Sequence, residues 1–198
     1  LAVEGYNALN LLGLGSATGL LSSWGSTREL VPIMIALAFT TQAGCRFTAQ
    51  LGAMRVSEEI DALEVMAISS IPFLVSTRIV AGLVAIIPLY SLASLASFLA
   101  SRFATVFVYG QSPGVYDHYF DTFLIPSDIL WSFVQAIAMA VAVMLIHTYF
   151  GFNASGGPVG VGVAVGNAVR ASLVVVVVIT LLTSLAIYGS DGNFNLAG

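Results

Sequence analysis

The sequence predicts an all-α membrane protein, with about five helices crossing the bilayer, the first of them truncated, and one short helix outside it. Hydrophobic residues make up 58% of the chain and charged residues 8%, and the mean hydropathy is +0.97. A soluble domain carries roughly 25% charged residues. Most of this protein's surface must therefore face lipid, where a helix satisfies its own backbone hydrogen bonds.

Three segments are apolar over the length of about 20 residues that a membrane-spanning helix needs. They are Ile79–Phe103, Ile129–Phe150 and Ala171–Tyr188. The last contains five consecutive valines, which favour strands in water, but a lone strand in lipid would leave its backbone unpaired. Pro88 is expected to kink the first of these spans.

A fourth span begins as the apolar run Leu30–Phe39 and then turns polar. Small residues recur every four positions after it, at Gly44, Thr48 and Gly52. Such a stripe lets membrane helices approach closely, so we extend this helix to about Met54 and expect the stripe to pack against another helix. A short helix followed by a loop is the alternative.

The first residues of the sequence are expected to belong to an incomplete membrane span. Residues 1–14 are predicted to be the end of an earlier span whose start precedes Leu1, and the polar residues after Gly189 resemble a natural terminus. No linker divides the sequence, so residues 1–198 are expected to form a single transmembrane domain.

The most polar stretch, residues 55–70, contains a short two-faced helix. Ser57 suits the N-cap and acidic residues suit the first turn, and Pro72 ends the segment. At 100° per residue one side carries Ile60, Leu63, Met66 and Ala67, and the other Glu58, Asp61 and Glu64. This is the layout of a coupling helix that docks a permease onto an ATPase, and a solvated acidic surface helix fits equally well.

The arginines near span ends give the topology. Arg46, Arg55, Arg78 and Arg170 fall on one side, and Arg28 and Arg102 on the other. This bias places residues 55–70 and the glycine-rich loop 151–166 in the cytoplasm. The acidic connection 108–127 and the C-terminus are then outside.

The sequence lacks the residues that several other functions require. The net charge of −4 argues against nucleic acid, and the one cysteine, Cys45, excludes a cysteine-rich metal site. His118 and His147 lie in different elements, so no metal site is expected. Without a lysine, no Walker A sequence is possible. Two alternatives to a permease stay open: a proton-coupled secondary transporter with Gln42, Arg46 and Gln50 as its polar site, and an intramembrane lipid enzyme.

The run from Leu51 to Met66, followed by Ser76-Thr77-Arg78, resembles the signature of the MlaE/YrbE permeases that serve MCE-protein ABC transporters. Further motifs resemble the actinobacterial B-type YrbE subunit, closest to the fourth, cholesterol-importing mycobacterial MCE system. They are Gly110-Gln111-Ser112, residues 116–120, residues 156–162 and Asn193-Phe194-Asn195. The sequence departs from the family pattern where Gln42 and Gln50 are neutral and where Thr77 replaces proline.

This resemblance implies a multi-pass plasma-membrane importer of lipid or sterol, without catalytic residues, metal or cofactor of its own. The implied partners are an A-type permease, a cytoplasmic ATPase dimer that binds ATP and Mg²⁺, and extracytoplasmic MCE proteins. The implied ATPase-coupling residues are Glu58, Glu59, Ile60, Asp61, Leu63, Glu64 and Met66. The implied substrate cavity takes Tyr6, Arg28, Glu29 and Leu30, with Ile33 and Leu37 on the same helix.

Overall fold

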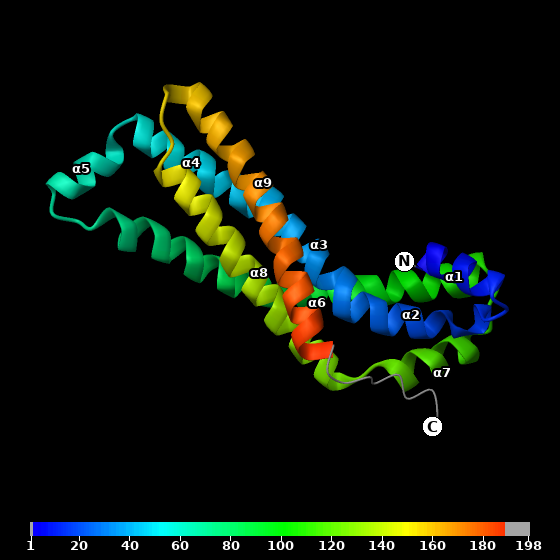
Figure 1. The fold of residues 1–198 in the computed structure, drawn as a ribbon. Helices are drawn as coiled ribbons and strands as arrows, with labels where there is room; N and C mark the ends of the chain where they lie inside the picture. The colour runs from blue at the N-terminus through cyan, green and yellow to red at the C-terminus, as the bar shows by residue number, and fades with distance from the viewer. Residues whose placement is uncertain (1, 189–198) are drawn as a thin grey trace. The chain divides into compact units, whose positions relative to one another are not determined.

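The computed structural model describes residues 2–188, which are helical almost throughout and contain no strand (Figure 1). The terminal motif Asn193-Phe194-Asn195 and the expected position of the C-terminus lie outside these residues. The α-helices are α1 (Ala2–Leu11), α2 (Thr18–Gly25), α3 (Val31–Ala38), α4 (Cys45–Val56), α5 (Glu59–Val65), α6 (Thr77–Phe103), α7 (Pro113–Phe123), α8 (Pro126–Phe152) and α9 (Gly157–Thr183). Short π-helical turns join several of them, including Ser26–Leu30, Phe39–Gly44, Pro72–Ser76 and Ala104–Val108.

Four helical stretches in the described part of the chain are long and apolar enough to cross a membrane. They are Gly15–Val56, Pro72–Val108, Pro126–Phe152 and Gly157–Ile187. The all-α membrane fold is therefore confirmed. The helix that was expected to continue past Phe39 does so, to Val56. Helix α1, the part expected to end an earlier span, has 10 residues, fewer than the about 20 that crossing requires.

Three boundaries differ from the sequence prediction. With the truncated segment at α1 counted as the first span, Gly15–Val56 is the second span and Pro72–Val108 the third. The second span begins at Gly15 rather than Leu30, and its polar residues, such as Ser22 and Ser26, are buried. The glycine-rich stretch 151–166 is mostly helix, since α9 starts at Gly157. The outer connection 108–127 contains the helix α7, whose mixed polar and aromatic residues hide it from a hydropathy scan.

Contacts within the chain divide it into two compact units. Among the described residues, the first unit holds 2–33 and 89–134, and the second holds 34–88 and 135–188. The boundaries fall inside α3, α6 and α8. Each unit has its own packing.

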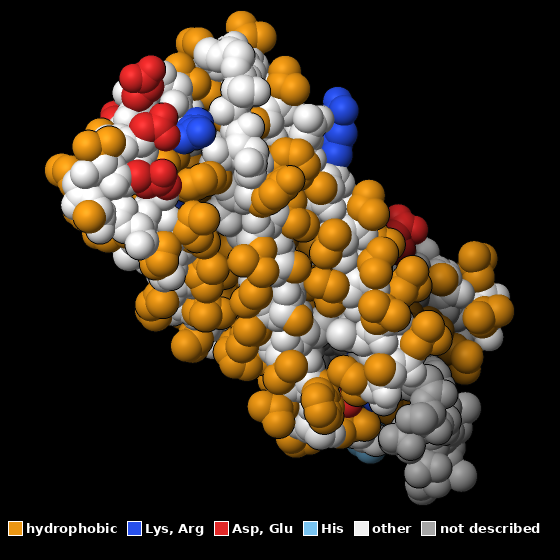
Figure 2. All heavy atoms as spheres, turned by 60° about the vertical axis from the view of Figure 1, so that its left-hand side comes forward, with side chains coloured by type: hydrophobic (Ala, Val, Ile, Leu, Met, Phe, Trp, Pro, Cys, Tyr) orange, Lys and Arg blue, Asp and Glu red, His pale blue; other side chains and the backbone are white. Residues whose placement is uncertain are grey.

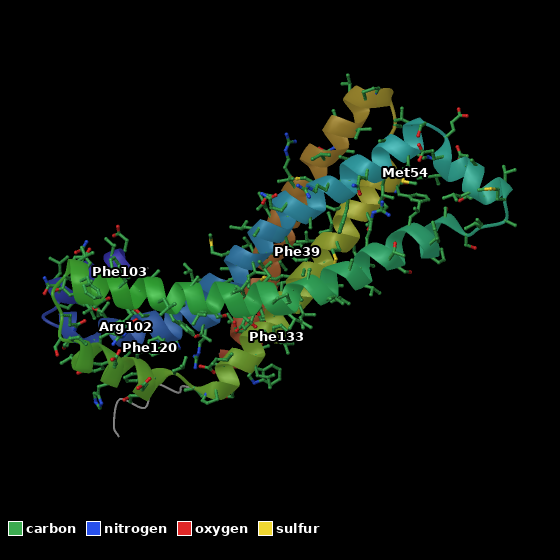
Figure 3. All side chains as sticks on the ribbon, turned by 180° about the vertical axis from the view of Figure 1, so that it is seen from behind. Phe39, Met54, Arg102, Phe103, Phe120 and Phe133 are labelled. Atoms are coloured by element: carbon green, nitrogen blue, oxygen red, sulfur yellow. The ribbon has the colours of Figure 1, made fainter. Side chains whose placement is uncertain are left out.

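In the first unit, α7 lies directly on α2 because Gly19 lets the two backbones meet. A Cβ atom at Gly19 would lie 2.5 Å from the Tyr116 carbonyl oxygen. Helix α7 also holds α6: Arg102 donates two hydrogen bonds of 2.8 Å to Asp117, and Phe120 packs edge-on against Phe98 (Figure 3). The Arg102 guanidinium holds the pKa of the Asp117 carboxyl below its usual value.

A buried ion pair joins α8 to the second span within the same unit. The Arg28 Nη2 atom lies 2.6 Å from Asp128 Oδ2, and both side chains are about nine-tenths buried. The guanidinium also lies over the Trp24 ring, 5.4 Å from its centroid. One turn further along α8, the buried Ser132 hydroxyl donates to the Thr27 carbonyl. This polar seam neutralises the charge of Arg28.

In the second unit, α4 packs closely against α8 and α9. Gly44 faces the ring of His147, and a Cβ there would lie 2.6 Å from His147 Cδ2. One turn on, Thr48 Oγ1 lies 2.8 Å from His147 Nδ1. Gly52 faces Ala154 and Val161 in the same way. The histidine is fully buried and forms part of this helix packing.

Helix α6 joins this packing through another glycine. A Cβ at Gly82 would overlap the Met144 sulfur of α8, and Phe39 lies against the same position (Figure 3). A separate apolar cluster contains Ala36, Met139, Val143 and Val176. Together these contacts link parts of all four membrane-spanning stretches within the second unit.

The Gly44 contact predicts that a single methyl group destabilises the protein. Gly44→Ala drives a Cβ into the His147 ring and should cost about 1–3 kcal/mol through overpacking. Gly162 of α9 has no atom within 4 Å of an added Cβ, so Gly162→Ala is the matched control. Thermal unfolding of the purified chain in detergent should show a lower Tm for Gly44→Ala alone. Equal Tm values for both variants would contradict the contact.

The buried ion pair predicts a strong asymmetry between single and double replacement. Arg28→Met leaves the Asp128 carboxylate buried without its partner and should cost about 3–5 kcal/mol. Arg28→Met combined with Asp128→Leu removes both charges and should recover most of the loss. Thermal unfolding measures both. A double variant no more stable than the single one would argue against the pair.

Candidate functional site

The charged loop between α4 and α5 is positioned by an unusual turn. Helix α4 ends at Val56, and the Ser57 hydroxyl donates to the Ala53 carbonyl. The sequence suggested that Ser57 caps the start of α5. In the structure Ser57 instead closes the end of α4, and Glu58 takes the N-cap position of α5. Glu58 has a left-handed backbone with φ of 60°, which redirects the chain into α5. The helix ends at Val65, and Ala67 is again left-handed at φ 60°.

Helix α5 is anchored to the body of its unit through one fully buried side chain, Ile60. Ile60 is fully buried and clusters with Leu51 of α4 and Leu74 before α6. Three half-buried side chains pack around this cluster, namely Met54, Leu63 and Phe152. Met54 lies near the end of α4, beside the turn into α5 (Figure 3). The short helix is therefore fixed to α4, α8 and the start of the third span.

Acidic side chains gather on the outer face of this loop, beside apolar ones (Figure 2). Arg55 Nη1 lies 2.6 Å from Asp61 Oδ1. The Ser70 hydroxyl donates to Glu64 Oε1, and the Ser57 Oγ atom lies 3.0 Å from Glu59 Oε1. All four acids of the loop, Glu58, Glu59, Asp61 and Glu64, are exposed. Their net negative charge faces solvent and suits a basic partner surface.

A second feature of the loop is an exposed apolar ridge. Met66 was grouped with Ile60 and Leu63 on one helical face, but it is 61% exposed. The grouping is wrong because α5 ends at Val65, before the face can continue. The ridge consists of Val65, Met66, Ile68, Ile71 and Phe73, all exposed. It borders a surface pocket of about 410 Å³ lined by Glu64 and residues 67–72.

The residues expected to form a substrate cavity lie in different surroundings. Tyr6 is half-buried and stacks on Tyr109, with ring centroids 4.0 Å apart. Arg28 is 8% exposed and bound to Asp128, while Leu30 is 36% exposed. Three others are half-buried, namely Glu29, Ile33 and Leu37. Tyr6, Arg28, Glu29, Leu30 and Ile33 belong to the first unit and Leu37 to the second, so their shared role stays a prediction.

Sequence reasoning missed Asp128 as the partner of Arg28. The two residues are 100 positions apart, and no short motif links them. One signal was available: an acid in the first turn of an otherwise apolar span needs a counter-charge. In the described part of the chain, no three metal-ligating side chains gather into a cluster.

A comparison of the chain with protein families matches residues 1–186 to the permease MlaE family. The intermembrane phospholipid transport system permease protein MlaE of Haemophilus influenzae is 29% identical, over 93% of this chain and 72% of that protein. A probable ABC transporter permease protein of Rickettsia bellii is 25% identical over 93% of this chain and 72% of its own length.

A plant protein is similar as well. Protein trigalactosyldiacylglycerol 1, from the chloroplast of Arabidopsis thaliana, is 27% identical over 92% of this chain. The chain spans about half of that relative, 52% of its length. The family match covers nearly all of the helices described above. The chain belongs to the MlaE permease family.

Proposed function

We propose that this chain is the membrane-embedded permease subunit of an ATP-driven MCE-type lipid importer, and that its α4–α5 loop docks a cytoplasmic ATPase. Family membership supports the permease role. The relatives from Haemophilus and Rickettsia carry the names of a phospholipid transport permease and an ABC transporter permease. The energy for transport is then supplied by a partner protein.

The single observation that carries the docking role is the construction of α5. Its inner side is locked to the helix bundle through Ile60 and Leu51. Its outer side offers acidic side chains beside the exposed Val65 and Met66. An ATPase groove with basic and apolar side chains fits such a surface. A displacement of α5 would then be passed to α4 by packed atoms rather than by a flexible loop.

The energy must enter from outside these 198 residues. They contain no lysine, and a P-loop needs its lysine on the β- and γ-phosphates of ATP. In this proposal ATP and Mg²⁺ are bound by the ATPase dimer. The loop and the α8–α9 turn then lie in the cytoplasm, and the acidic helix α7 lies outside, beneath the extracytoplasmic MCE proteins.

The substrate path is proposed to include Tyr6, Glu29 and Leu30, together with Ile33 and Leu37. A sterol is a rigid apolar body with one hydroxyl, and apolar walls with one or two polar groups suit it. Arg28 is the group that would suit an anionic headgroup, yet it is buried against Asp128. This neutralised arginine supports a sterol over a phospholipid.

The secondary-transporter alternative placed Gln42, Arg46 and Gln50 at an internal polar site. In the structure all three side chains lie on the surface of the chain and are exposed. No arrangement described above favours that alternative or a lipid enzyme.

The docking role predicts that reversing the two acids at the start of α5, neither of which forms an ion pair in the described chain, releases the ATPase. Glu58→Lys with Glu59→Lys keeps the Arg55–Asp61 pair and turns two exposed negative charges positive. We expect the ATPase recovered with the tagged permease to fall at least about tenfold, equivalent to about 1.4 kcal/mol. Asp121→Lys, an exposed acid of α7, is the control and should leave recovery unchanged. Equal recovery from both variants would refute docking through α5.

The sterol assignment predicts selective labelling by a photoreactive cholesterol. In the purified transporter this probe should label the permease, while a photoreactive phosphatidylcholine should label it weakly. Leu30→Asp places a charge in the proposed path and should reduce cholesterol labelling severalfold. Labelling by the phospholipid alone would remove the sterol assignment and leave the permease role standing.

A further inference from the structure

Helix α4 has two faces of different character. The buried face consists of Gly44, Thr48, Leu51 and Gly52. The opposite face, called the polar face here, consists of Gln42, Arg46, Ala49, Gln50 and Ala53, and all five residues are exposed. Gln42 lies in the preceding π-helical turn, within the same membrane-spanning stretch.

The polar face differs from the surfaces that suit lipid. Exposed positions of α9 carry large apolar residues, such as Val174, Val177 and Leu181. The exposed surface of α6 is similar, with Val84 and Leu95. Between Met34 and Val56, by contrast, no large hydrophobic side chain is exposed. Polar residues within a span normally face protein or an aqueous cavity rather than lipid tails.

The depth of Arg46 sharpens this point. Arg46 precedes Arg55, at the charged loop, by nine positions, which is about 14 Å along a helix. The hydrocarbon core is about 30 Å thick, so when the loop lies at the membrane surface Arg46 lies well inside the span rather than near its end, where the arginine count had placed it. A charge at that depth is costly unless it is paired.

The described chain offers Arg46 no acid. The ion pairs of this part of the protein engage Arg28, Arg55 and Arg102. No Asp or Glu occurs from Leu30 to Ser57 in the sequence, so neither α4 nor the 15 residues before it contain a carboxylate. Within the described residues, therefore, no carboxylate neutralises Arg46.

We propose that the polar face of α4 packs against a transmembrane helix of a different membrane subunit, whose carboxylate pairs with Arg46 inside the bilayer. Ala49 and Ala53, four residues apart, allow close approach of the two helices. Gln42 and Gln50, on either side of Arg46, supply interhelical hydrogen bonds. The proposal rests on the proposed permease function only in taking the chain to span the membrane.

Charge excludes a second copy of this chain from that role. In a two-fold symmetric pair the same patch lies on both partners. Two copies of the polar face would bring arginine toward arginine, with only glutamine beside them. A non-identical subunit with an acid at the matching depth provides the complementary charge.

Photo-crosslinking in membranes of the source cells identifies the neighbour directly. The full chain, expressed with its native partners, carries p-benzoylphenylalanine at Gln50, or at Val177 of α9 as the lipid-facing control. We expect Gln50 adducts with another membrane subunit, on a peptide that contains Asp or Glu within an apolar span, and lipid adducts at Val177. Gln50 adducts with lipid alone, or with a second copy of this chain, would overturn the proposal.

A charge exchange tests the carboxylate itself. Arg46→Glu should lower the amount of that subunit recovered with this chain at least about tenfold, equivalent to about 1.4 kcal/mol, while Arg46→Lys retains it. Replacing the crosslinked acid by arginine should restore recovery of Arg46→Glu. Normal recovery of Arg46→Glu, or a failure of the exchange, would overturn the pairing. ATPase recovery through α5 is scored separately, so a loss of docking is not confused with a loss of this interface.

The isolated chain provides the folding control. Since Arg46 is exposed and bound to no acid of the described chain, Arg46→Glu and Arg46→Lys should have the same Tm in detergent. A Tm of Arg46→Glu far below that of Arg46→Lys would mean that the arginine stabilises the chain itself and would overturn its assignment to an interface.

Discussion

The close packing of α4 against α8 and α9 is the contact on which the second unit depends. Without side chains at Gly44 and Gly52, the buried face of this helix approaches the His147 ring near its start and Ala154 with Val161 near its end. Between these two glycines, Thr48 lies within hydrogen-bonding distance of the His147 ring. Because membrane helices gain little from the hydrophobic effect, contact distance and such polar links decide their association.

The same helix connects the membrane to the charged loop. Leu51 on its buried face contacts Ile60, the anchor of α5. Arg55 at its end binds Asp61 of α5. The buried face thus joins the bundle to the proposed ATPase-docking surface, while the polar face is left for a partner inside the bilayer. One helix therefore serves three contacts, each made by different residues.

The parts of the fold that could be predicted from sequence are those governed by local pattern. Long apolar runs identified the later spans, and the spacing of Gly44, Thr48 and Gly52 indicated that the helix continues past its polar residues. Polar segments that are buried by tertiary contacts could not be assigned this way. Ser22 and Ser26 are buried inside the second span, and α7 is held against α2 by the backbone contact at Gly19.

The candidate site shows the same division. The acidic face and the buried Ile60 follow from helical spacing, but the exposure of Met66 depends on where α5 ends. The left-handed residues Glu58 and Ala67 set both ends of this loop, and neither is a glycine that would have signalled such a turn. The Arg28–Asp128 pair depends on contacts between helices far apart in the chain.

The central claim is that α5 transmits ATP hydrolysis to the membrane helices through Ile60. The most direct measurement is the amount of lipid transported per ATP hydrolysed by the reconstituted transporter carrying Ile60→Ala. This change removes buried atoms, at a cost of about 2–5 kcal/mol, and leaves the exposed surface of α5 in place. Our account predicts normal ATPase recovery and hydrolysis with transport per ATP reduced severalfold. An unchanged ratio would contradict it.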